Sequence, residues 1–282
     1  MLRKCPLWII GLLLLLSGCS SKFAYNNLDW LVYWYVDDYI ELTRSQKKTV
    51  DAKLQGWLQW HRKDELQRYQ QQLITIREQH RDGALDFDQW LGHFEQGRQH
   101  WYRFRDKLAP DLVELAPMLT DQQINEMFDE LEKENAEQQE QRANKTQQEL
   151  AEQRFEEIVE NFEEFVGNLS TAQEQVIKQA LPEFQSAFES WLAYRRAWQS
   201  AAREMLINQR NTAGFSTSFL HLITNPQEFQ AQQFITLVEQ NRMVYARLVA
   251  DIDQSLSAKQ RSKMDHELTD LIDDLGDLID SD

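Results

Sequence analysis

The sequence has few of the residues that cross-link a chain, break a helix or build a catalytic site. Two cysteines, nine glycines and five prolines occur among its 282 residues. It contains no Gly-rich phosphate loop, no His-Glu-x-x-His motif and no Gly-x-Ser-x-Gly motif. A di-iron site in a helical bundle would need Glu-x-x-His pairs, and no histidine here has that spacing. The sequence therefore predicts no catalytic residue, no metal site and no cofactor.

Strand-like alternation of apolar and polar residues is also missing, and helical spacing takes its place. Apolar residues recur every three or four positions along most of the chain. With glycine and proline scarce, long helices joined by short turns pack as antiparallel neighbours. We therefore expect an all-α fold, an elongated bundle of long antiparallel helices.

The first nineteen residues carry the most specific functional signal. Arg3 and Lys4 precede an apolar run from Leu7 to Leu16, which is short for a membrane-spanning helix. Leu16-Ser17-Gly18-Cys19 then resembles the lipobox of bacterial lipoproteins. The resemblance implies that a signal peptide, residues 1–18, is removed and that Cys19 receives a diacylglycerol and an N-acyl chain such as palmitate. The alternative is an ordinary secretory signal that happens to contain a cysteine.

The residues after Cys19 bear on where the protein is anchored. Ser20 and Ser21 follow it, and by lipoprotein sorting rules the absence of aspartate favours the outer membrane, with the chain facing the periplasm. Residues 19–27 are expected to form a lipidated tether. Cys5 leaves with the signal, so no disulfide can form within the mature chain.

The balance of charge is strongly acidic. The formal net charge of −16 becomes −18 once Arg3 and Lys4 are removed. Such a chain is a poor candidate for binding nucleic acid or an anionic lipid surface. A basic partner protein and simple solubility are the two interpretations that remain.

Four stretches of the form Leu-[Ser/Thr]-x-x-Gln indicate where helices begin. A hydroxyl caps the first backbone N–H groups, and the glutamine three residues later hydrogen-bonds back to the cap, so each stretch is expected to begin a helix. The boxes are Leu42, Thr43 and Gln46; Leu119, Thr120 and Gln123; Leu169, Ser170 and Gln173; and Leu256, Ser257 and Gln260.

The pattern indicates an internal duplication. A shift of 127 residues aligns the apolar positions of 28–57 with those of 155–184, and a shift of 137 aligns later positions. We therefore expect two tandem related halves, 28–131 and 155–282, joined by a charged helical connector, 132–154. That connector is either a solvated helix or a disordered linker. The extra ten residues of the second half are expected in a loop at 208–224, and Pro110 and Pro117 are expected to bend or break a helix.

The segment 28–42 allows two interpretations. It is apolar on most faces, and Trp30 and Trp34 flank its main stripe, while Asp29, Asp37 and Asp38 make it unsuitable as a membrane span. It is either a central core helix or a helix whose aromatic residues touch the membrane interface. Because its counterpart in the second half has a core pattern, we expect a core helix.

Candidate binding residues are aromatic. Trp57 and Trp60, with Trp191 and Trp198 in the second half, are candidates for an apolar groove that binds client peptides, although tryptophans at helical spacing are usually core residues. His61 and Glu65 lie one turn apart, but two ligands do not make a metal site. His93 and His100 are expected to be packing residues.

Two resemblances complete the sequence evidence. The lipobox, Tyr25-Asn26-Asn27-Leu28-Asp29-Trp30-Leu31 and Trp57-Leu58-Gln59-Trp60-His61 resemble an uncharacterised family of Gram-negative lipoproteins. The four boxes are similar to those of the Spy and CpxP family. This second resemblance implies an envelope-stress chaperone or adaptor that binds clients on a helical cradle, although those proteins are small and unlipidated.

These observations favour a non-catalytic outer-membrane lipoprotein that binds envelope proteins, either as a chaperone or as an adaptor. The alternatives are a structural spacer between membrane and cell wall, or an enzyme on envelope material that uses carboxylates such as Asp37 and Asp38. The sequence indicates no particular oligomeric state.

Overall fold

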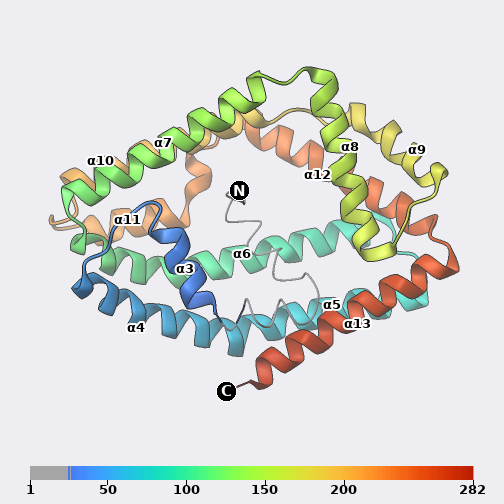
Figure 1. The fold of residues 1–282 in the computed structure, drawn as a ribbon, viewed down its shortest axis with the longest axis horizontal. Helices are drawn as coiled ribbons and strands as arrows, with labels where there is room; N and C mark the ends of the chain where they lie inside the picture. The colour runs from blue at the N-terminus through green and yellow to red at the C-terminus, as the bar shows by residue number, and fades with distance from the viewer. Residues whose placement is uncertain (1–24, 26, 282) are drawn as a thin grey trace. The chain divides into compact units, whose positions relative to one another are not determined.

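The computed structural model describes residue 25 and residues 27–281, and the regular structure in these residues is entirely helical (Figure 1). This confirms the predicted all-α class. The α-helices are α3 (Leu28–Val36), α4 (Arg44–Trp60), α5 (Leu66–Asp82), α6 (Phe87–Leu115), α7 (Asp121–Ala143), α8 (Gln147–Val166), α9 (Thr171–Ala180), α10 (Phe188–Asn208), α11 (Phe215–Thr224), α12 (Gln232–Gln254) and α13 (Ala258–Asp280). Shorter helical segments are the π-helical η1 (His61–Glu65) and the 3-10 helices η2 (Ala116–Met118), η3 (Leu181–Glu183) and η4 (Pro226–Phe229).

Helices begin at side-chain caps, as the sequence predicts. Thr43, Thr120 and Ser170 each accept the backbone N–H of the glutamine three residues later, whose side chain accepts the N–H of the cap. Ser257 and Gln260 make the same two hydrogen bonds, at 3.3 and 3.0 Å. Asp86 caps α6 in the same way.

The charged connector is helical but not continuous. A sixth capping box, at Thr146 with Glu149, begins α8 after a short break that follows α7. The sequence pattern, which left a helix or a linker open for 132–154, does not locate this break, because charged residues with high helix propensity surround it on both sides.

Three other details bear on the sequence-based prediction. Helix α6 continues through Pro110, so that proline does not break it, whereas Pro117 lies in η2, after α6 has ended. The predicted loop at 208–224 contains α11, because Phe215, Phe219 and Leu222 recur at helical spacing and are buried. The segment 28–42 is not a core helix: it is helical only to Val36, and none of the residues of α3 is buried.

The chain divides into two compact units. One contains the described residues up to Arg77 together with those from His266 onward, and the other is Glu78–Asp265. The division falls within α5 and α13. The predicted tandem halves, with their boundaries at 131 and 155, do not follow this division and stay a prediction, as does the elongated antiparallel bundle.

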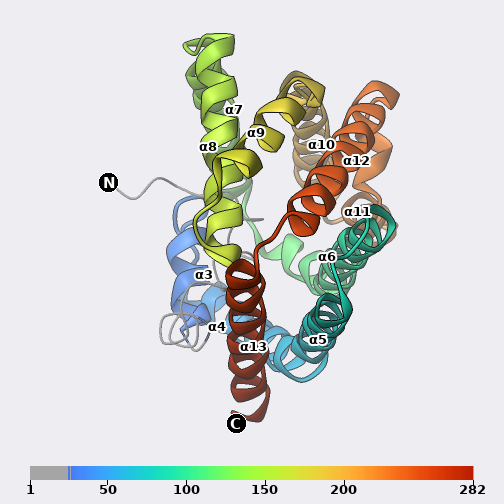
Figure 2. The same cartoon turned by 90° about the vertical axis from the view of Figure 1, so that its right-hand side faces the viewer.

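The larger unit is held by helices that pack along their lengths. Helices α7 and α10 run side by side (Figure 1), and α8 lies beside α9 (Figure 2). Side chains from α6, η2, α7, α10 and α11 form one apolar cluster: Val113, Ala116, Ile124, Phe128, Ala202, Leu206, Phe215, Phe219 and Leu222.

The smaller unit has its own core. Tyr25 and Leu66 pack with Leu275 and Leu278 of α13, and Leu28, Tyr69, Leu73 and Ile279 pack around them. Tyr25 is only 3% exposed. The segment predicted as a tether, residues 19–27, therefore contains a residue that is part of the fold.

Candidate functional site

Two of the predicted boxes meet in the larger unit. The side-chain amide of Gln173 donates to the carbonyl oxygen of Gln260 at 3.1 Å, and Gln260 donates back to Gln173 at 3.0 Å. Each carbonyl oxygen also accepts the backbone N–H of its own cap, Ser170 or Ser257. Both glutamines are buried, so their polar atoms need these partners. The pair fixes the starts of α9 and α13 against each other.

A buried carboxylate organises another junction of the same unit. Asp253, at the end of α12, is 3% exposed. One of its oxygens lies 3.0 Å from Nε2 of His80, and the other accepts the backbone N–H of Leu85 at 2.9 Å and the indole N–H of Trp90 at 3.2 Å. Arg261 contacts the first oxygen at 3.5 Å and donates to the backbone carbonyl of Asp253 at 2.7 Å. Because polar groups from four elements converge on this buried carboxylate, we interpret the centre as structural.

The π-helical turn holds a polar centre in the smaller unit. The hydroxyl of Tyr25 lies 3.0 Å from Nδ1 of His61, and Tyr69 meets the imidazole edge-on. Burial lowers the pKa of His61 to about 4 and raises the pKa of Tyr25 to about 12. Both shifts favour a neutral hydroxyl beside a neutral imidazole at physiological pH. Glu65, one turn on, is 1% exposed and lies 3.9 Å from Arg68.

The remaining candidate histidines and carboxylates do not gather into a reaction centre. His93 is buried, with Nε2 2.8 Å from the side-chain oxygen of Gln79, and burial lowers its pKa. His100 is buried beside Arg103. Asp37 and Asp38 are exposed, and Asp37 pairs with Lys47 at 3.7 Å. In the described residues, no three His, Cys, Asp or Glu side chains are grouped as a metal ion would require.

The four candidate tryptophans are half-buried. Trp57 and Trp60 belong to the smaller unit, and Trp191 and Trp198 belong to the larger one. Trp198 packs against the apolar cluster and donates its indole N–H to the carbonyl of Leu222 at 3.1 Å. Trp191 lies against Phe188, and the guanidinium of Arg195 lies over its ring. Their role in client binding stays a prediction.

The sequence analysis missed a more exposed apolar surface, where α6 packs on α12. Phe94 contacts Tyr245 with ring centroids 5.7 Å apart, and Glu95 pairs with Arg242 at 3.1 Å. Trp90 is also hydrogen-bonded to Asp253. Along these three contacts the residue numbers increase on α6 and decrease on α12, so the two helices run antiparallel. Further along α6, the side chains on these two helix faces are more exposed.

At that end of the seam the side chains are apolar and exposed. Trp101 lies eleven residues after Trp90 and Val238 seven residues before Tyr245, so each continues the face of its helix that forms the seam. Trp101 is 53% exposed and Val238 43%, and Ile235, one turn before Val238, is 41% exposed. Phe104 stacks on Trp101 with centroids 6.0 Å apart. We call Trp101, Phe104, Ile235 and Val238 the open seam.

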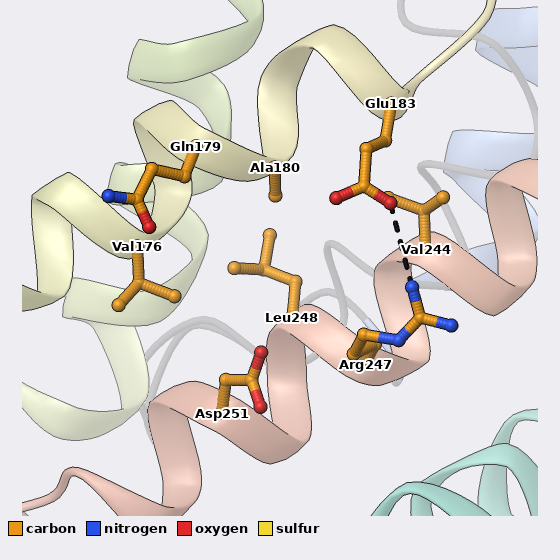
Figure 3. Close-up of a pocket in the computed structure, with 8 residues that line it drawn as sticks. All are labelled: Val176, Gln179, Ala180, Glu183, Val244, Arg247, Leu248 and Asp251. Carbon is orange, nitrogen blue, oxygen red and sulfur yellow. Dashed lines mark ion pairs between the residues drawn. The ribbon is translucent and has the colours of Figure 1, made fainter.

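A small pocket lies on another face of α12. It holds about 130 Å³ between α9, η3 and α12 (Figure 3). Val176, Ala180, Val244 and Leu248 supply apolar walls, and Glu183 pairs with Arg247 across it at 3.5 Å. This volume is below that of typical small-molecule sites, so the pocket suits a single side chain better than a metabolite.

The membrane-related predictions rest on the sequence. Cys19, the predicted lipidation site, and the signal peptide lie outside the described residues. Among the described residues, no helix is long and apolar enough to cross a membrane.

Comparison with known proteins places the chain in a family. The model of a family of unknown function, DUF6279, matches residues 38–234. The chain belongs to this family. The match confirms the predicted membership of an uncharacterised family and extends from the end of α3 to the start of α12. No curated protein and no solved structure matches the chain.

Proposed function

We propose that this DUF6279 protein is an outer-membrane lipoprotein that faces the periplasm and binds envelope proteins without catalysing a reaction. The lipobox ending at Cys19 supports the anchor, since several acyl chains hold a protein firmly to a bilayer. The proposed activity needs no cofactor beyond these covalent lipids. Binding takes place on the helical surface of the chain, in the manner of a chaperone or an adaptor.

The open seam is the observation that carries the binding proposal. An exposed aliphatic or aromatic side chain is common by itself, but here the helix faces place Trp101 and Val238 along one seam, with Ile235 a turn away. Exposed apolar side chains on two adjacent antiparallel helices offer a contact surface to the apolar side chains of a partner segment. Trp101 has the properties of an anchor, because tryptophan gives a large contact area at a low cost in conformational entropy.

The surroundings of the seam indicate which segments it would bind. Arg98 and Arg242 both pair with Glu95, and Arg242 also pairs with Glu239. The charges that border the open seam therefore compensate each other locally. A partner segment needs apolar side chains for the seam and has no need of a strong charge of either sign, which fits the exposed apolar stretches of unfolded proteins.

Suppression of aggregation tests the proposal. The mature chain is mixed with an unfolded model client, and light scattering is followed with wild type and with a Trp101→Ser, Val238→Ser double variant. We expect wild type to suppress scattering near an equimolar ratio and the double variant to have lost most of that effect, because two of the apolar contacts are gone.

A matched control uses Trp34→Ser, which removes a tryptophan of the other unit that is exposed to the same extent as Trp101, 53%. The control variant should suppress aggregation to the same extent as wild type. All three proteins should show the same helical circular dichroism spectrum. Absence of suppression by wild type would contradict the chaperone form of the proposal.

A further inference from the structure

The exposed tryptophans of α3 have no role in the proposed binding surface. Trp30 is 63% exposed and Trp34 is 53% exposed, and they lie one helical turn apart on the same face. The other side of the helix is held within the smaller unit: Leu28 packs on the core cluster, and the hydroxyl of Tyr33 donates to Asp51 at 2.6 Å. Helix α3 is thus fixed on one side and presents two large indole rings on the other.

The distance to the proposed lipid is limited by the chain itself. Tyr25 is 3% exposed and contacts His61, so the fold holds the chain at this residue. Cys19 precedes Tyr25 by six residues, and six extended residues span at most about 20 Å. A lipid on Cys19 would therefore keep the bilayer surface within about 20 Å of Tyr25, and α3 begins three residues later.

We propose that Trp30 and Trp34 insert into the headgroup region of the membrane and set how the smaller unit lies on the lipid surface. Tryptophan favours this region, because its ring is apolar and its N–H remains in contact with water and headgroups. This inference rests on the proposed lipid anchor at Cys19.

The charges near α3 define the kind of lipid. Helix α3 contains Asp29 and no basic residue, and Asp37 and Asp38 follow it. Lys47 pairs with Asp37 and lies over the ring of Tyr33, so it offsets one of these three acidic charges. Acidic side chains are repelled by an anionic surface. The partner is therefore a zwitterionic lipid surface, and the contact is expected to weaken as anionic phosphatidylglycerol replaces phosphatidylcholine.

Quenching of tryptophan fluorescence by brominated lipid tests the contact. The mature lipidated chain is reconstituted in phosphatidylcholine vesicles that carry bromine near the top of the acyl chain. We expect wild type to be quenched and a Trp30→Phe, Trp34→Phe double variant to have lost most of the quenching. Trp101→Phe, which removes a tryptophan that is also 53% exposed, should keep it. Equal quenching in the double variant and wild type would overturn the proposal, as would quenching that rises with anionic lipid.

A second arm separates this proposal from the anchor on which it rests. Cys19 is the one cysteine that remains after residues 1–18 are removed, so its thiol can be coupled to a maleimide lipid. The intact mass and flotation of the native protein test acylation, whereas the coupled protein tests α3 whatever those measurements give. Quenching that depends on Trp30 and Trp34 in the coupled protein supports the α3 contact, and its absence there overturns it.

Discussion

At the scale of single residues, Asp253 is a buried side chain that contacts polar groups from several elements of the larger unit. Its carboxyl group has almost no access to water, and it accepts hydrogen bonds from a backbone N–H and from the indole of Trp90, beside His80 and Arg261. A buried charge is tolerated only when such partners surround it. No local pattern in the sequence marks this residue, because its partners come from α5, α6, α13 and the turn before α6.

Replacing Asp253 with asparagine tests this centre. Asparagine puts an N–H₂ group where one of the two oxygens lies, so either the N–H groups of Leu85 and Trp90 or the guanidinium of Arg261 loses its acceptor. We expect Asp253→Asn to lower the free energy of unfolding by about 3 kcal/mol in urea denaturation. Asp251→Asn removes the same charge from an exposed position of the same helix and should cost less than about 0.5 kcal/mol. Equal costs in the two variants would show that the network around Asp253 contributes little.

His61 makes the smaller unit sensitive to acid. Its pKa is lowered to about 4 in the fold and is 6.5 in the unfolded chain, so between these values the unfolded state binds more protons. The contribution of His61 to the free energy of unfolding is therefore fully present above pH 6.5. It is lost as the pH drops towards 4, and the loss amounts to about 3 kcal/mol. Histidine C–H signals in nuclear magnetic resonance should show His61 titrating near pH 4. In His61→Gln the loss of stability over this range should be smaller, and a His61 pKa near 6.5 would contradict the account.

At the scale of elements, the boxes show what a short sequence pattern determines. A capping box is completed within four residues, so Thr43, Thr120, Ser170 and Ser257 could be recognised as helix starts from the sequence alone. The pairing of Gln173 with Gln260 joins residues 87 apart and could not be predicted in this way. The open seam was missed for the same reason: that its residues continue the packed faces of α6 and α12 follows only once the antiparallel packing of the two helices is known.

The start of helix α8 allows the effect of a capping box to be tested separately from packing. The box at Thr146 and Glu149 is exposed, so a substitution there changes the cap and little else. Thr146→Ala should cost about 1 kcal/mol of stability and speed amide hydrogen exchange in the first turn of α8. Thr146→Ser keeps the hydroxyl and should behave like wild type. If alanine and serine gave the same exchange rates, the box would not hold the start of the helix.

At the scale of the whole molecule, the proposed lipid contact and the proposed binding surface belong to different units. Tyr25 and α3 belong to the unit that follows the proposed anchor, and the open seam belongs to the other unit. The all-α class and the family could be predicted from composition, periodicity and local motifs. The two compact units could not, because each is defined by contacts between distant parts of the chain.

The central claim, that the open seam binds partner proteins, is tested most directly by photo-crosslinking. A photoreactive phenylalanine analogue is placed at position 101, at position 238 or at Ser200, which is exposed on α10. Each protein is illuminated with an unfolded model client. We predict crosslinks from positions 101 and 238 and few from position 200. Equal crosslinking from all three positions, or crosslinking from position 200 alone, would contradict the account.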